Sequence, residues 1–414
     1  MARNDTSMDS PRKAAYEALL TWKRSETFIL HSLSEWQATS RPEARDFALA
    51  YEIAAGVVRR WRTLDASIDL LTSKRVKARE RVLLALGLYQ LWWMHSVPPH
   101  AALNETVQLA KSCIHASAGP FVNAVMRRAL ADGQPVFSEP GLHYSLPDHY
   151  VGLLRSELGD RATACMEHSL SPPPLMLRVR ADLPADLTAQ LGSSDGLPDG
   201  MYRVDGESIP QLAHREEVYI QNATPFALLS RLRPLLRQPS QVLDLCAAPG
   251  GKLIALHDFF PSAELFANDV SEQKLAKLRS NLTKYGIDCT FFCGPGQELP
   301  KDRNYDLIIC DVPCSNSGVL GKRPEARWRL EPHALAELLS LQRSLLRHAA
   351  DLLAPGGQLC YMTCSILCEE NEGMLDWACE ELGLTIQSNP ELLLPNAEGW
   401  DGGFAGLLER PSDY

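Results

Sequence analysis

The sequence predicts a chain of three parts: an all-helical bundle over residues 1–135, a mixed α/β connecting subdomain over 136–235, and an α/β domain with a doubly wound sheet over 236–414. Apolar residues recur at helical spacing in the first part, Pro and Gly interrupt the second, and strands alternate with helices in the third. With 414 residues and 45% hydrophobic content, the chain is long enough for two or three domains with cores of their own.

In the first part, apolar side chains between Phe47 and Trp61 recur at intervals of four and three residues, which is one face of an amphipathic helix. Arg59, Arg60 and Arg62 fall off this apolar stripe, so we expect them to face solvent. The same spacing predicts further helices at Leu84–Leu91, Ala101–Ser112 and Phe121–Leu130. A small helical bundle follows from these segments.

The middle part combines sequence patterns of loops, helices and strands. A polar passage with Pro and Gly over 133–147 precedes a helical segment over 150–168, which three prolines at 172–174 terminate. The next six residues, Leu175–Arg180, alternate in the manner of an exposed strand.

The last part alternates short apolar runs with amphipathic segments. Strands are expected at Val242–Leu245, Glu264–Asn268, Thr290–Cys293, Leu307–Cys310 and Gln358–Met362. Helices are expected at Leu253–Phe260, Glu272–Tyr285, His333–Leu353 and Glu369–Leu382. Such an alternation predicts a sheet whose ligand crevice lies at the carboxyl ends of the strands.

The net charge of −10 is distributed unevenly along the chain. Residues 1–135 carry 18 Lys and Arg against 13 Asp and Glu, a balance of +5, which leaves −15 for the remainder. Clustered positive charge of this kind can contact RNA phosphates, although a solvated helical face is the alternative. The residues expected to bind RNA are Arg59, Arg60, Arg62, Lys74, Arg75 and Lys77.

The composition also predicts a compartment. The longest apolar stretch, Val82–Met94, is too short to span a bilayer, and the first residues lack the apolar core of a signal peptide. We therefore expect a cytoplasmic protein without a membrane partner. Its 11 cysteines include no Cys-x-x-Cys pair, so we expect neither a disulfide framework nor a bound metal.

A Gly-bearing turn follows the first expected strand of the last part, at Cys246–Lys252. Backbone N–H groups and a helix N-terminus at such a turn suit a polar cofactor. The turn is not a Walker A loop, because Cys246 stands where Gly is required and Leu253 where Ser or Thr is required. Asp269 ends the next strand, where an acid can bind the two hydroxyls of a ribose. S-adenosylmethionine, NAD and other adenosine-bearing ligands all fit this pattern.

Cysteines follow the fourth and fifth expected strands, in Asp311-Val-Pro-Cys314 and Thr363-Cys364. Methylation of cytosine at C5 requires such a thiol, because C5 becomes nucleophilic only after a thiolate adds to C6. Asp311 can hydrogen-bond the edge of the base. Buried core cysteines are the alternative for either residue alone, and the spacing does not say which of the two would attack.

The chain resembles the RNA (cytosine-5) methyltransferases of the Sun/Fmu type in Cys246-Ala-Ala-Pro-Gly-Gly-Lys252, Asp311-Val-Pro-Cys-Ser315 and Thr363-Cys-Ser365 followed by Glu369-Glu-Asn371. The first third is similar to the NusB-like RNA-binding domain of that family in Gly87–Leu91, Pro98–Thr106 and Asn123–Arg128. The resemblance implies a NusB-like bundle followed by a Rossmann-like methyltransferase domain, and it covers nearly the whole chain.

The resemblance further implies methylation of cytosine C5 in 16S ribosomal RNA through a covalent adduct between a cysteine and C6. It assigns Cys364 as the nucleophile, Cys314 as an aid to product release, and Asp311 to a place beside cofactor and base. The residues implied to hold S-adenosylmethionine are Cys246, Ala247, Ala248, Pro249, Gly250, Gly251, Lys252, Asp269 and Asp311.

Two positions depart from the family pattern. Pro295 occupies the region where the family usually has an acid near the adenine, and Gln297 or Glu298 could substitute for it. Asn222 stands where the family has Asp, so we expect an acidic contact to be missing. The rival functions are the same chemistry on transfer RNA or another RNA, a non-catalytic RNA-binding assembly factor, and a nucleotide-dependent oxidoreductase. We expect the protein to act as a monomer.

Overall fold

The computed structural model describes residues 10–412, the side chain of Asp186 excepted, and groups the chain into two compact units. The first unit consists of the chain up to Ser156 together with a short later segment, Arg323–Trp328. The second consists of Glu157–Lys322 and Arg329–Tyr414. The expected connecting subdomain is therefore divided, with residues 136–156 in the first unit and 157–235 in the second.

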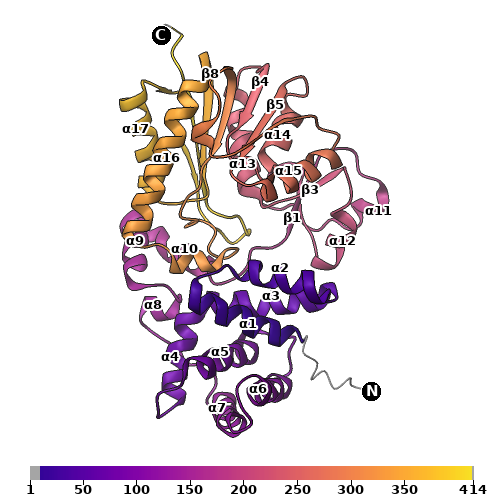
Figure 1. Cartoon of the computed structure of the whole chain (residues 1–414), viewed down its shortest axis with the longest axis vertical. Coiled ribbons are helices and arrows are strands. Elements are labelled where there is room, and N and C mark those ends of the chain that lie inside the picture. The colour runs from indigo at the N-terminus through magenta and orange to yellow at the C-terminus, as the bar shows by residue number, and fades with distance from the viewer. Residues whose placement is uncertain (1–9, 413–414) are drawn as a thin grey trace. The chain divides into compact units, whose positions relative to one another are not determined.

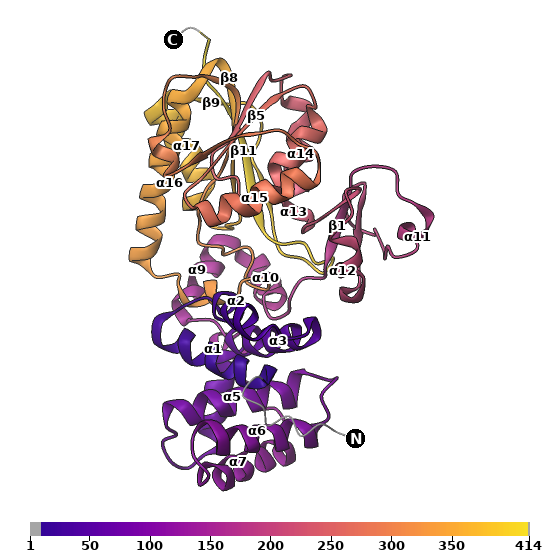
Figure 2. The same cartoon turned by 45° about the vertical axis from the view of Figure 1, so that its right-hand side comes forward.

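The first unit is helical, and Figure 2 shows α5, α6 and α7 side by side. Its helices are α1 (Pro11–Ser25), α2 (Ile29–Ser40), α3 (Ala44–Arg59), α4 (Trp61–Leu71), α5 (Ala78–Trp93), α6 (Pro99–Cys113), α7 (Ala118–Asp132), α8 (Pro140–His143) and α9 (Asp148–Leu158), whose last two residues belong to the second unit. The expected helix from Phe47 to Trp61 is two helices that meet at Arg60, where φ and ψ are −108° and 14°. The expected bundle is confirmed.

The second unit opens with the short helix α10 (Ala162–His168) and a small antiparallel sheet in the order β2-β1-β3. Its strands are β1 (Met176–Val179), β2 (Met201–Arg203) and β3 (Val218–Ile220). The expectation of an exposed strand here is wrong, because β1 lies between the other two and its first three residues are buried. Figure 2 shows β1 with α11 (Ala185–Thr188) and α12 (Ile209–Leu212), whose Leu187 and Leu212 pack into its core.

The main sheet of the second unit has the strand order β10-β11-β8-β7-β4-β5-β6. Its parallel strands are β4 (Gln241–Asp244), β5 (Glu264–Asp269), β6 (Thr290–Cys293), β7 (Tyr305–Asp311) and β8 (Leu353–Thr363). All five match the expected strands. Because the chain crosses over between them, their carboxyl ends lie along one edge of the sheet.

Helices cover both faces of this sheet (Figure 1). On one face lie α13 (Ala223–Leu232), α14 (Gly251–Phe259) and α15 (Glu272–Lys284), and on the other α16 (Pro332–Leu352) and α17 (Glu372–Leu382). Successive residues of the central strands point to opposite faces of the sheet. Leu243 and Ile308 pack in the core on the α16 face, and Val242 and Ile309 pack in the core on the α14 face.

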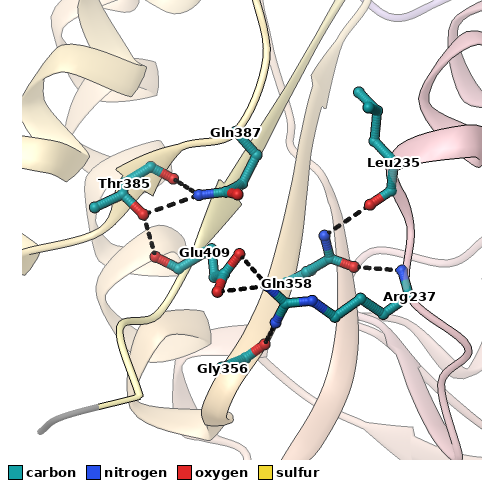
Figure 3. Close-up of polar contacts among 7 residues, drawn as sticks. All are labelled: Leu235, Arg237, Gly356, Gln358, Thr385, Gln387 and Glu409. Carbon is teal, nitrogen blue, oxygen red and sulfur yellow. Dashed lines mark hydrogen bonds and ion pairs between the residues drawn. The ribbon is translucent and has the colours of Figure 1, made fainter.

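The C-terminal strands were not expected from the sequence. They are β9 (Thr385–Ile386), β10 (Glu391–Leu393) and β11 (Gly403–Glu409), and β11 pairs antiparallel with β8, which makes the sheet mixed. Figure 3 shows how polar contacts fasten this side of the sheet: Arg237 binds both carboxylate oxygens of Glu409 at 2.8 Å, and Gln358 bonds the backbone of Arg237 and Leu235. The Cys364 loop thus leaves a strand that is paired on both sides.

Candidate active site

The expected cofactor turn lies at the carboxyl edge of the main sheet, between β4 and α14. Gly250 has a φ of +107°, a backbone conformation that side chains disfavour, so Gly is required at this position. The turn leads into the N-terminus of α14, whose first N–H groups have no partner within the helix. The backbone therefore offers hydrogen-bond donors beside the crevice, as a polar ligand requires.

Asp269 lies at the end of β5, next to this turn. It is 4% exposed, and its Oδ2 accepts a hydrogen bond of 3.2 Å from the backbone N–H of Ala248. The Lys274 ammonium lies 3.2 Å from Oδ1. The carboxylate is thus held against the cofactor turn, which is where ribose binding would need it.

A cavity of about 200 Å³ adjoins the turn, and its lining includes Tyr219 and Lys322, which the sequence did not single out. Gln221, Asp244, Asp311 and every residue of the turn except Gly250 also line it. Gln221 Nε2 is buried and has no hydrogen-bond partner within the described residues, so it can serve a bound ligand. The donors around this cavity fit the carboxylate of S-adenosylmethionine, whereas Asp269, the acid expected at its ribose, is not among the lining residues.

Lys252 and Asp311, which both line the cavity, form an ion pair. Burial lowers the pKa of the Lys252 ammonium, but the Asp311 and Asp244 carboxylates outweigh burial and raise it overall. Burial also raises the pKa of Asp244 to about 7. Lys252 therefore stays charged and holds the Asp311 carboxylate in one place beside the cavity.

Cys314 and Cys364 come together where the neighbouring strands β7 and β8 end. Their sulfur atoms lie 3.1 Å apart, although they are 50 residues apart in the chain. Cys314 is 8% exposed, whereas Cys364 is half-buried. The hydrogen bond with Cys364 and burial both raise the pKa of Cys314 well above its usual range, so Cys314 keeps its proton at neutral pH.

A network of hydroxyl groups and one buried carboxylate connects the two cysteine loops. Glu370 is 0% exposed, and it accepts bonds from the backbone N–H of Ser315 at 2.8 Å and from its hydroxyl at 2.5 Å. Gln342 donates to the same carboxylate at 3.0 Å. Ser317 and Ser365 join their hydroxyl groups at 2.9 Å. Because every bond crosses between the loops or anchors one of them, the separation of the two thiols is strongly constrained.

Asn222 forms a structural connection in this chain. Its Oδ1 accepts bonds from the N–H groups of Thr224 and Asp401, at 3.1 and 3.0 Å, and its Nδ2 donates to the Gly399 carbonyl at 2.9 Å. An aspartate could not make the last bond. Pro295 precedes a short helical turn, η4 (Gly296–Glu298). Substitution for the missing acid by Gln297 or Glu298 stays a prediction.

The basic residues of the helical unit separate into two groups. The expectation that Arg59 faces solvent is wrong, because Arg59 is 3% exposed. Arg62 is engaged with Asp148 through two bonds of 2.8 and 2.7 Å, and the Arg60 guanidinium lies 5.0 Å from the ring centre of Trp93. By contrast, the α4–α5 loop presents exposed basic side chains, namely Lys74, Arg75 and Lys77.

Residues 10–412 contain no group of three or more His, Cys, Asp or Glu side chains arranged to hold a metal ion. Over that same range, every helix is too short or too polar to cross a membrane.

Comparison with known proteins identifies the two parts. Residues 232–385 match the family model described as 16S rRNA methyltransferase RsmB/F, and residues 9–131 match the NusB family. The chain is 31% identical over 392 residues to ribosomal RNA small subunit methyltransferase B of Salmonella arizonae, covering 88% of this chain and 90% of that protein. The corresponding protein of Vibrio cholerae is 29% identical over 415 residues, covering 92% and 94%.

Solved structures agree on the fold. The crystal structure of PH0851 superposes with a TM-score of 0.76 at 20% identity, covering 97% of this chain and 98% of that one. A methyltransferase homolog from Pyrococcus horikoshii covers 66% of this chain and 97% of its own, with a TM-score of 0.56 and 22% identity. The chain therefore belongs to the 16S rRNA methyltransferase RsmB/F family and is an S-adenosylmethionine-dependent methyltransferase of ribosomal RNA.

Proposed function

We propose that this enzyme methylates C5 of a cytosine in 16S ribosomal RNA through a covalent bond between Cys364 and C6 of the base. The observation that carries the proposal is the 3.1 Å separation of the Cys314 and Cys364 thiols, which follow the neighbouring strands β7 and β8, with Asp311 as the last residue of β7. Two thiols at one site suit a reaction in which one sulfur attacks carbon and the other assists a later step. A cytoplasmic location follows from the ribosomal substrate.

Each group then has a defined task. Cys364, the more exposed thiol, loses its proton and adds to C6, which moves electron density to C5. S-adenosylmethionine, when bound, supplies the methyl group that C5 takes up. A base, either solvent water or a side chain of the site, next takes the C5 proton, and the electrons of that bond restore the C5–C6 double bond as the C6–S bond breaks. Cys314, which keeps its proton, assists this release by donating a hydrogen bond to the departing Cys364 sulfur, 3.1 Å away.

The ion pair of Lys252 and Asp311 supports the same chemistry. Asp311 is fixed by Lys252 at the edge of the cavity, where its carboxylate can accept a hydrogen bond from the base. Asp269 and the turn from Cys246 to Lys252 would hold the cofactor. We propose that the exposed loop residues Lys74, Arg75 and Lys77 contact RNA phosphates.

The test separates the two cysteines by substitution. Cys364→Ala should abolish methylation and form no covalent RNA complex, because the attacking sulfur is gone. Cys314→Ala should attack and then stall, so that RNA remains attached to Cys364. A denaturing gel measures this, since only a covalent complex shifts the protein band. A shifted band in Cys364→Ala would contradict the choice of nucleophile, and absence of a band from both variants with modest loss of activity would contradict the covalent mechanism.

A further inference from the structure

Asn316 occupies an unusual backbone position in the Cys314 loop. Its φ is +61°, in the left-handed region that residues other than glycine seldom adopt. Asn tolerates this region better than most residues, because its short side chain can bond locally. Gly would adopt this backbone conformation as well as Asn does, so the conformation alone does not explain why the residue has a carboxamide side chain.

The carboxamide of Asn316 bridges the two cysteines. Its Oδ1 accepts a hydrogen bond from the Cys364 thiol at 3.3 Å, and its Nδ2 donates to the backbone carbonyl of Cys314 at 2.9 Å. Glycine at this position would preserve the loop conformation and lose both bonds. The side chain is thus connected to the sulfur that attacks and to the backbone that carries the second sulfur.

A cysteine side chain has a single rotatable bond, so its sulfur occupies one of three staggered positions. In the rotamer that the structure shows, the Cys364 sulfur makes the bond to Asn316 and the contact with Cys314 at the same time. Because Oδ1 can only accept, this bond orients Cys364 while the thiol is protonated and ends when the proton leaves, whereas the bond from Nδ2 to Cys314 keeps the carboxamide in place. Asn316 therefore selects a direction for the sulfur before the base arrives.

We infer that Asn316 is a positioning residue for the nucleophile: it holds the Cys364 sulfur in its attacking direction and couples it to the Cys314 loop. The inference rests on the covalent mechanism proposed above. Displacement of a reacting atom by about 1 Å can cost about 100-fold in rate, so orientation by one hydrogen bond can matter greatly.

The decisive variant is Asn316→Gly, because Gly adopts a positive φ at no steric cost and removes only the carboxamide. Its matched control is Arg41→Gly, which makes the same kind of change at an exposed residue with a φ of +48°. We expect Asn316→Gly to lower kcat and the single-turnover rate of adduct formation by about 10- to 100-fold. The KM for RNA, the affinity for S-adenosylmethionine and the melting temperature should stay unchanged, as should all parameters of Arg41→Gly.

Two outcomes would contradict the inference in different ways. A wild-type kcat in Asn316→Gly, with a normal Cys364-dependent RNA adduct, would show that Asn serves only the left-handed backbone. If the wild-type enzyme methylated RNA without forming a covalent adduct at Cys364, the covalent mechanism would be refuted, and the role of Asn316 would be refuted with it. A raised KM with unchanged kcat would make Asn316 a substrate-binding residue and would also overturn the positioning role.

Discussion

The α3–α4 junction and the α4–α5 loop each carry three basic residues. Those of the junction contact other parts of the helical unit, whereas those of the loop are exposed. At the junction, Arg59 is buried and Arg62 binds Asp148, whereas Lys74, Arg75 and Lys77 of the loop are exposed. The junction lies in the packed interior of the helical unit, where helix ends leave backbone carbonyls without partners. Positive charge at the junction serves the fold, and of the two clusters it is the loop that we propose to contact RNA.

The segment Arg323–Trp328 shows what the junction requires. Arg327 is 0% exposed, and its guanidinium bonds the carbonyls of Arg59 at 2.7 Å and of Pro324 at 3.2 Å. The Trp328 indole donates to the Val58 carbonyl at 3.0 Å, and the Glu325 carboxylate accepts from the first N–H of α2 at 2.9 Å. A guanidinium offers five donors in a fixed plane, so it can satisfy several carbonyls at once.

The largest expected effect follows from removing that guanidinium. Arg327→Met keeps much of the side-chain volume but leaves buried carbonyls unsatisfied, so we expect a loss of about 3 kcal/mol in unfolding free energy. Urea denaturation measures it, with Arg75→Met in the exposed loop as the matched control, expected within about 0.5 kcal/mol of wild type. Equal stability of the two variants would mean that the buried Arg327 guanidinium contributes no more to the fold than the exposed one of Arg75.

Arg62→Ala should have a smaller effect on stability. The variant loses the two bonds to Asp148 and one of 2.5 Å to the Leu146 carbonyl, and Asp148 is largely exposed, so we expect about 1 kcal/mol. The bond from Arg62 lowers the pKa of Asp148. This stabilisation is therefore present above the unfolded-state pKa and should disappear as the pH falls through the lower pKa of the folded state.

A pH series of urea midpoints for wild type and Arg62→Ala checks this prediction, and Asp148→Ala completes a double-mutant cycle. The RNA affinity of Arg62→Ala and its salt dependence should match those of wild type. A weaker dependence of RNA affinity on salt in this variant would mean that Arg62 does contact RNA phosphates.

The smallest effect on stability is expected in the loop. Replacing Lys74, Arg75 and Lys77 with Gln should leave the unfolding free energy within about 0.5 kcal/mol of wild type. Each lost contact to a single-stranded phosphate should reduce the slope of log K against log salt by about 0.7. Filter binding over a salt series measures the slope, with cofactor affinity as the internal control. An unchanged slope would identify the loop as an ordinary solvated surface.

The sequence by itself determined the helical first part, the strands β4–β8 and the cofactor turn. Apolar periodicity and the positions of Gly and Pro are local signals, and they are preserved wherever the segment packs. The alternation of strands and helices also predicts that the carboxyl ends of β7 and β8 are neighbours. The sequence could therefore predict that Cys314 and Cys364 lie near each other, but it could not predict the distance between their sulfur atoms.

Only the tertiary structure decided the remaining features. Insertion of β11 beside β8, burial of Arg59, and incorporation of Arg323–Trp328 into the helical unit all depend on partners far away in the chain. The bridge from Asn316 to Cys364 depends on a backbone φ of +61° that no residue pattern specifies. An arginine has the same charge in water and in a core, so its role depends on which carbonyls and carboxylates the fold brings to it.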